Sequence, residues 1–307
     1  MKESYPSMAA DSMVQNVQEQ QPPVSPQLLT IRALVAYVDD QEKRNILLGR
    51  HPLPGEDLTQ LEETIAKYNA ARASLPVFIS TNPIVSEEDS LLDTIRARPD
   101  VMDAFTSLGI PWRAVMIDLR HVLAFQPAVR VDDLDERVAT ALKNHDALMQ
   151  LCFPSNVLME ASFETNEHGH TCITSSPNFT LIPSQLPVQI GGQIILTPAF
   201  VPQLNSNFFN VAYYQGRYFI RDGYHRAVGL LRNTTEAQVI VPCILVEAQT
   251  LSQTGWKPGM IAEAVLLSER PPRLSDFWDT SVSHELLRRA TRRVFRMRLD
   301  FFETAVL

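Results

Sequence analysis

Residues 217–246 constrain the fold more than any other part of this 307-residue sequence. Residues 218–220 are strand formers, Asp222 and Gly223 form a turn signal, and residues 227–232 are compatible with a short helix. The almost unbroken apolar run of residues 239–246 then predicts a buried strand. This order predicts a strand, a tight turn, a helix and a second strand. The two strands are far enough apart in sequence for a right-handed parallel crossover.

The turn within this stretch carries the functional prediction. Gly223 can adopt a positive φ, and the helix after it leaves its first amide groups without intrahelical partners. His225 and Arg226 lie in that first turn. The helix dipole disfavours a positive charge there, and a bound anion reverses that cost. A glycine turn, a helix N-terminus and an adjacent arginine together predict a phosphate site. Its candidate binding residues are Gly223, Tyr224, His225 and Arg226.

Asp222 and His225 are the candidate catalytic residues of this site. A carboxylate beside a phosphate repels it, so Asp222 has three interpretations. It caps the helix, it holds Mg²⁺, or it orients an acceptor hydroxyl. We prefer the cap. The competing interpretation is that the whole motif has a structural role only: it starts a helix, and Gly223 simply turns the chain.

The motif alone predicts weak binding. A helix N-terminus stabilises an anion by roughly 0.3–1 kcal/mol and a charged hydrogen bond adds about 1.5–3 kcal/mol, which corresponds to about millimolar affinity for bare phosphate. A nucleotide therefore needs a base or ribose pocket as well. Tyr213, Tyr214 and Tyr218 are the candidates for stacking on a base, but aromatic residues on strands more commonly belong to the core.

The segment Ile-Arg-Asp-Gly-Tyr-His-Arg-Ala of residues 220–227, followed by a strand that contains Val-Pro, resembles the core motif of the ParB/sulfiredoxin superfamily. In that superfamily the motif contacts nucleotide phosphates. The resemblance therefore implies this role for Gly223, His225 and Arg226, flanked by Asp222 and Tyr224. It covers about residues 207–247. It implies a mixed β-sheet core and a nucleotide of the ATP or CTP type, with Mg²⁺ left open as a companion ion.

Two departures from the superfamily narrow the function. Sulfiredoxins carry a reactive cysteine directly before the His-Arg pair, where this chain has Tyr224, and a phenol cannot perform thiol chemistry. Partition-type ParB proteins continue into a helix-turn-helix region, which is not recognisable after Ala248. The expectation is a protein that binds a nucleotide or a phosphorylated small molecule, as a phosphotransferase or nucleotide hydrolase. The alternatives are a non-enzymatic, nucleotide-responsive regulatory or DNA-associated module, and a scaffold with a degenerate motif.

Composition limits the partners. The net charge of −8 opposes non-specific binding of nucleic acids, with a local basic patch as the exception. The strongest positive run lies near the C-terminus. Its members are Arg288, Arg289, Arg292, Arg293, Arg296 and Arg298. A solvated face is the simpler interpretation of this run, and a nucleic-acid contact is the functional one. Three widely spaced cysteines predict neither a disulfide framework nor a CxxC metal site, and with no apolar spanning run the sequence predicts a cytoplasmic protein.

The sequence predicts an α+β fold with a mixed ParB/sulfiredoxin-like sheet and a helical N-terminal layer. Residues 1–25 are expected to be a disordered tail, 26–150 mainly helical, 151–250 the strand-rich core, and 251–307 C-terminal helices and a strand packed on the core. Within these regions we expect helices near residues 26–44, 55–74, 134–151 and 283–292, and strands near 157–163, 170–175 and 295–301.

The sequence also offers a cluster of metal-ligating residue types, although we do not expect a metal site there. Its candidate ligands are Glu164, Glu167, His168, His170 and Cys172. They surround an expected hairpin tip, where exposed polar residues are ordinary.

Overall fold

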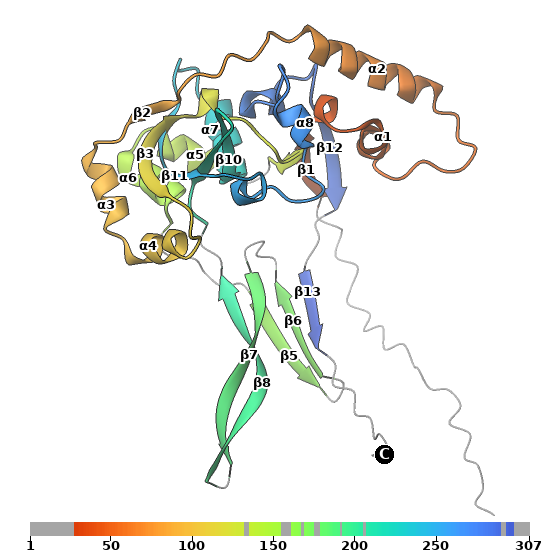
Figure 1. Cartoon of the computed structure of the whole chain (residues 1–307). Coiled ribbons are helices and arrows are strands. Elements are labelled where there is room, and N and C mark those ends of the chain that lie inside the picture. Colours follow the sequence, from red (N-terminus) through yellow and green to blue (C-terminus); the bar gives the residue numbers. More distant parts are fainter. Residues whose placement is uncertain are drawn as a thin grey trace, which may run out of the picture.

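A five-stranded mixed sheet forms the centre of the protein (Figure 1). The structure, a computed structural model, describes residues 28–131, 135–154, 161–166, 169–174, 179–190, 192–204, 207–289 and 293–297. The strand order of the central sheet is β10-β9-β11-β3-β2. These strands are β2 (Ile84–Ser86), β3 (Trp112–Asp118), β9 (Asn210–Tyr214), β10 (Arg217–Asp222) and β11 (Ile240–Glu247).

Helix α7 (Tyr224–Arg232) connects β10 to β11, as the sequence predicts. The pairing differs from the prediction, however. β10 forms an antiparallel hairpin with β9, and β11 returns beside β9 and runs parallel to it. The parallel crossover that the sequence allows does not join the two strands that flank the turn, because the hairpin places β9 between them. The parallel crossover instead joins β9 to β11 and contains both β10 and α7.

The apolar residues of β11 and α7 are buried in the hydrophobic core. Six consecutive residues of β11 are buried, which is the pattern of a strand covered on both faces. Seven of the nine residues of α7 are buried as well. Both elements belong to one large hydrophobic cluster with β3, β9 and η2 (Leu119–His121). Helix α7 is therefore packed into the core along most of its length, with His225 as the exposed residue of its first turn.

Further helices lie beside the sheets (Figure 1). They are α1 (Asp40–Leu48), α2 (Thr59–Ser74), α3 (Ser90–Arg96), α4 (Pro99–Thr106), α5 (Asp135–Ala141), α6 (His145–Cys152) and α8 (Glu263–Leu266), with 3₁₀ turns η1 (Val35–Tyr37), η3 (Ser252–Thr254) and η4 (Leu274–Phe277). Helices α3 and α4 lie near β3, and α1 and α2 lie on the side of β1 (Leu28–Ala33) and β12 (His284–Arg289) (Figure 1). Side-chain caps fix several starts: Asp39 accepts from the Glu42 amide and Asp89 from the Leu91 amide. The single helix expected over 134–151 is two helices, because Asn144 caps α6 through the amides of Asp146 and Ala147.

A second sheet contains strands from three distant segments, in the order β12-β1-β4. They are β1 (Leu28–Ala33), β4 (Ala128–Arg130) and β12 (His284–Arg289). The helices expected at 26–44 and 283–292 are therefore wrong over these residues. Ile31 of β1 pairs with both Leu286 of β12 and Arg130 of β4, so each strand depends on partners remote in sequence.

Two smaller sheets lie apart from the central sheet in Figure 1. One has the order β13-β6-β5 and the other is the hairpin β7-β8. Their strands are β5 (Ala161–Asn166), β6 (Gly169–Thr174), β7 (Phe179–Ile190), β8 (Gln193–Leu204) and β13 (Arg293–Met297). The predicted hairpin arms on either side of residues 166–169 are confirmed. The strand expected near residues 295–301 is confirmed over 295–297, as part of β13, and its remaining residues lie outside the described ones. The expected tail, residues 1–25, lies outside the described residues.

Overall the chain is of the α+β class, as the sequence predicts. The central sheet nevertheless draws on both the expected helical region and the expected core, because β3 of the first pairs with β11 of the second.

Candidate functional site

Gly223 fixes the geometry of the predicted site. It is the N-cap of α7 and has φ 97° and ψ 16°, a left-handed conformation that glycine adopts without strain. A Cβ placed on Gly223 would stand 2.7 Å from Cδ2 of Phe209, a fully buried ring. Both backbone conformation and close packing therefore require glycine here. The predicted glycine turn into a helix is present.

Asp222 does not cap the helix, contrary to the preferred interpretation. Its Oδ1 accepts a hydrogen bond from the amide of Gly223 at 2.6 Å, and α7 has no side-chain cap. Oδ1 also lies 3.9 Å from the guanidinium of Arg226, a loose ion pair. Desolvation raises the pKa of Asp222, and the charge of Arg226 partly offsets the rise. The carboxylate therefore holds the turn itself.

Arg226 does not point to a ligand. Its side chain is buried, and its guanidinium donates to the carbonyls of Leu151 and Asn207 at 2.8 and 2.9 Å and to Oδ1 of Asn207 at 2.8 Å. It also lies over the ring of Phe209, 5.7 Å from the centroid. The guanidinium that the sequence predicts to contact phosphate is therefore bonded to the protein itself in this structure. Arg226 instead holds the end of α6 and the segment before β9 against α7.

Tyr224 also has a structural role. It is buried, and its hydroxyl accepts hydrogen bonds from the amides of Phe125 and Gln126 at 2.9 and 3.2 Å. Its ring packs edge-on against Phe125, with the centroids 5.7 Å apart. The side chain predicted to contact phosphate therefore supports the segment that follows η2.

His225 is the exposed side chain of the first turn. Desolvation, followed by the charges of Arg130 and Arg226, lowers the pKa of His225 from 6.5 to about 4. The ring keeps part of its surface in solvent, yet it lies close enough to surrounding protein and to the two arginines to remain neutral at pH 7. A base with such a pKa accepts protons poorly at neutral pH, so the environment opposes general-base catalysis.

The main chain offers the remaining donors. The amides of Tyr224, His225 and Arg226 are the first of α7 and have no i−4 partner within the helix. Among the described residues no side chain caps them. Arg221, just before the turn, is half-buried, and desolvation lowers its pKa. Arg130, on β4, acts on His225 through its charge. These two cations were missed by the sequence reasoning, since Arg130 is distant in sequence and Arg221 reads as an ordinary strand residue.

The tyrosines considered for base stacking lie elsewhere. Tyr213 and Tyr218 face each other with centroids 4.9 Å apart, and Tyr214 donates to Oε1 of Glu263. Arg217 pairs with Tyr214 at one end of the β9-β10 hairpin, while Asp222 pairs with Asn210 at the other. The tyrosines are thus near the end of the hairpin remote from α7.

In the part of the chain that the structure describes, no group of three His, Cys, Asp or Glu side chains could hold a metal ion. Glu164, His170 and Cys172 fall on β5 and β6, whereas Glu167 and His168 lie outside the described residues. The described helices include none long and apolar enough to cross a membrane. No protein-family model, curated protein or solved structure matches the chain.

Proposed function

We propose that the chain binds the phosphate group of a nucleotide or another phosphorylated small molecule at the start of α7. The observation that carries the proposal is the geometry of Gly223, which opens the first amides of a nine-residue helix beside the exposed His225. Helix N-termini bind anions because their amides are unpaired and the dipole is positive there.

Charge supports the same proposal. Arg221, Arg226 and Arg130 act on Asp222 or His225, while Asp222 is the carboxylate of the turn. Arg221 and Arg226 are thus the cations that act on the carboxylate of the turn, in a chain whose net charge is −8. The ligand contacts are the amides of Tyr224, His225 and Arg226 together with the neutral imidazole, whereas the side chains of Arg226 and Tyr224 stabilise the site from behind.

Binding without turnover fits this chemistry better than phosphotransfer or hydrolysis. The low pKa of His225 makes it a poor base, and Asp222 is engaged by the Gly223 amide. This favours the regulatory alternative, in which the nucleotide acts as a signal. Mg²⁺ then accompanies the nucleotide and needs no ligand from the turn.

The basic run near the C-terminus adds no support for nucleic-acid binding. Arg288 and Arg289 are exposed on β12, which pairs with β1, whereas Arg293 and Arg296 belong to β13, which pairs with β6. The run is thus divided between two sheets. Arg292 and Arg298 lie outside the described residues.

The test is a calorimetric titration with ATP, CTP and inorganic phosphate, with and without Mg²⁺. The His225→Glu variant places a negative charge at the mouth of the site, where the helix dipole tolerates it, so the fold is kept while affinity falls at least about tenfold. His225→Gln is the neutral control and retains binding. If no ligand binds the wild type, or if His225→Glu binds as well as His225→Gln, the proposal is wrong.

A further inference from the structure

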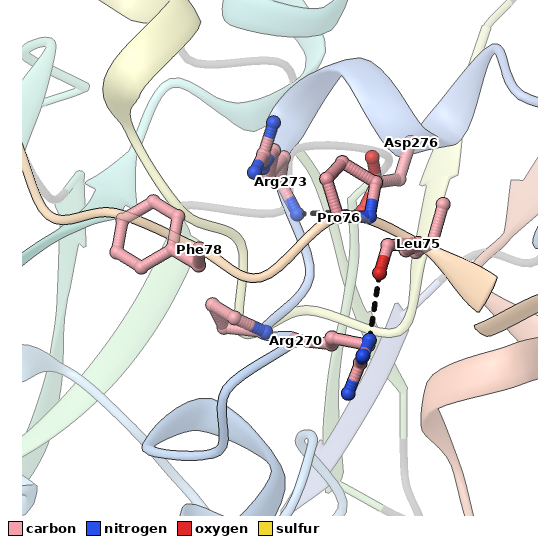
Figure 2. A pocket seen from close by; sticks show the side chains of 7 residues that line it. Leu75, Pro76, Phe78, Arg270, Arg273 and Asp276 are labelled. Carbon is pink, nitrogen blue, oxygen red and sulfur yellow. Dashed lines mark hydrogen bonds between the residues drawn. The ribbon is translucent and has the colours of Figure 1, made fainter. Parts of the chain in front are cut away.

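A small pocket lies away from the α7 motif, between the segment after α2 and the loop around η4 (Figure 2). Its lining residues are Leu75, Pro76, Phe78, Arg270, Pro271, Arg273 and Asp276. The free space is about 40 Å³. Ligand pockets for whole cofactors span roughly 300–1,000 Å³, and a single water needs about 10–15 Å³. The pocket therefore fits a group of a few heavy atoms and excludes a nucleotide base.

Arg270 and Arg273 line this pocket, and Arg72 and Arg217 contact residues of its lining. Main-chain carbonyls hold three of these four arginines. Arg217 donates to the carbonyls of residues 266–268 at the end of α8. Arg72 donates to the carbonyl of Arg270 and to Oγ of Ser268. Arg270 donates through Nε to the carbonyl of Leu75 at 2.7 Å. These bonds keep three positive charges at the end of α2 and beside the pocket. Desolvation and the charge of Arg270 lower the pKa of Arg72.

The fourth, Arg273, is different. Its guanidinium has no hydrogen-bond acceptor among the residues that the structure describes, and it lies over the ring of Phe78, 5.6 Å from the centroid. Arg217 lies 5.4 Å from the same centroid. Figure 2 shows the guanidinium groups of Arg270 and Arg273 pointing away from each other, with the segment that carries Pro76 between them. Arg273 is therefore a half-buried cation with its donors available at the pocket.

Asp276 is the carboxylate of the pocket, and it is already engaged. Its Oδ2 accepts from the hydroxyl of Tyr37 at 2.5 Å and from the backbone amide of Arg273 at 2.9 Å. Desolvation raises the pKa of Asp276. Arg273 acts on this carboxylate through its charge, and Asp279 is a second acid close enough to affect it. Glu269, a third acid, is largely exposed and 3.6 Å from Arg270. The four arginines are thus accompanied by three acids. The cluster therefore retains excess positive charge.

We propose that this pocket binds a small oxyanion of phosphate or sulfate size, either free or as the end group of a larger molecule, with Arg273 as the principal ligand. The planar guanidinium presents paired donors that match such oxygens, and the other three arginines supply the surrounding field. The site is independent of the α7 site, because it uses other residues and does not depend on the motif.

The test follows the arginine Nε–H signals by NMR during titration with sulfate and inorganic phosphate at constant ionic strength set with chloride. We expect the Arg273 signal to shift and saturate. Arg273→Met removes the saturable binding, and Arg273→Lys, which keeps the charge but not the fork, weakens it at least tenfold. Arg288→Met is the control, since Arg288 is exposed on β12, and it leaves binding unchanged.

The variant His225→Glu separates the two sites, because it leaves saturation of the Arg273 signal unchanged. Methyl phosphate distinguishes the two sources of the anion. Binding of methyl phosphate with the affinity of inorganic phosphate supports an end-group ligand, and binding of the inorganic ions alone supports a free ion. An Arg273 signal that shifts linearly with concentration overturns the proposal, and so do shifts of the Arg270 and Arg72 signals that are equal in Arg273→Met and the wild type.

Discussion

Gly223 lies so close to Phe209 that no other residue fits between the turn and the ring: a Cβ on Gly223 would approach Cδ2 of Phe209 to 2.7 Å. The same ring lies beneath the guanidinium of Arg226, 5.7 Å from its centroid. The turn, the helix start and the arginine are thus built on one buried aromatic side chain. Substitutions at Gly223 or Arg226 therefore disturb the packing around Phe209, which the sequence of the motif alone does not reveal.

Gly223→Ala destabilises the protein by roughly 2–4 kcal/mol, because the strain of a left-handed alanine adds to the cost of overpacking against Phe209. Gly216→Ala is a matched control: Gly216 has φ 75°, but a Cβ there would meet nothing within 4 Å. It therefore costs only the conformational part, about 1–2 kcal/mol. Urea unfolding of both variants measures the difference. Equal losses would show that contact with Phe209 is unimportant.

Arg226→Met destabilises the protein by about 2–4 kcal/mol, since it leaves the carbonyls of Leu151 and Asn207 without their charged donor. Arg288→Met, at an exposed position of β12, changes stability by less than about 0.5 kcal/mol. Chemical denaturation of both variants checks this prediction. A stable Arg226→Met protein with weakened phosphate binding would contradict the structural role and restore the ligand role predicted from sequence.

The candidate site shows what a local pattern can and cannot establish. The glycine turn and helix start were predictable, because Asp222 and Gly223 are adjacent and their conformational preferences are local. The roles of the next residues were not. Arg226 binds carbonyls 75 and 19 positions away in sequence, and Tyr224 binds amides about 100 positions away. A local motif therefore cannot show whether its polar side chains bind a ligand or bond to distant parts of the same chain.

The fold shows the same limit. Strand β11 was predicted because an apolar run buried on both faces has a clear pattern. β1 and β12 were expected to be helical, because the Leu and Glu residues of the His-Glu-Leu-Leu-Arg-Arg segment of β12 favour helices and the spacing in β1 is ambiguous. Their antiparallel pairing, Ala33 to His284 at one end, overrides these preferences. A pairing between segments so far apart leaves no local signal.

Tyr224→Phe destabilises the protein by about 1–3 kcal/mol, because the amides of Phe125 and Gln126 lose their acceptor in a buried environment. Tyr213→Phe, at a side chain that is 38% exposed, serves as the control and has a small effect. Hydrogen exchange gives a local readout: exchange of the Phe125 and Gln126 amides accelerates in Tyr224→Phe. Unchanged protection of both amides would argue against the hydrogen bonds to the hydroxyl.

His225 gives a prediction for pH. Its pKa in the folded protein is about 4, below the ordinary 6.5, because of desolvation and the charges of Arg130 and Arg226. The unfolded chain therefore binds more protons between these values, and the free energy of unfolding falls as the pH is lowered from 6.5 toward 4. His225→Gln lacks this contribution. The stability of the wild type relative to His225→Gln consequently declines over that window and is constant above it.

Other groups titrate in the same range, and the comparison with His225→Gln cancels them. Asp222 and Asp276 have raised pKa values, so the folded state binds more protons at these groups than the unfolded chain does. Their contribution to the free energy of unfolding therefore rises as the pH is lowered, opposite to that of His225, and it is present in both proteins. NMR separates the protein's seven histidines, with His225→Gln identifying the signal that disappears. That signal titrates near pH 4. A midpoint near 6.5, or a stability difference independent of pH, would show that neither burial nor the neighbouring arginines lower the pKa of His225. The charge argument for phosphate binding would then also be wrong.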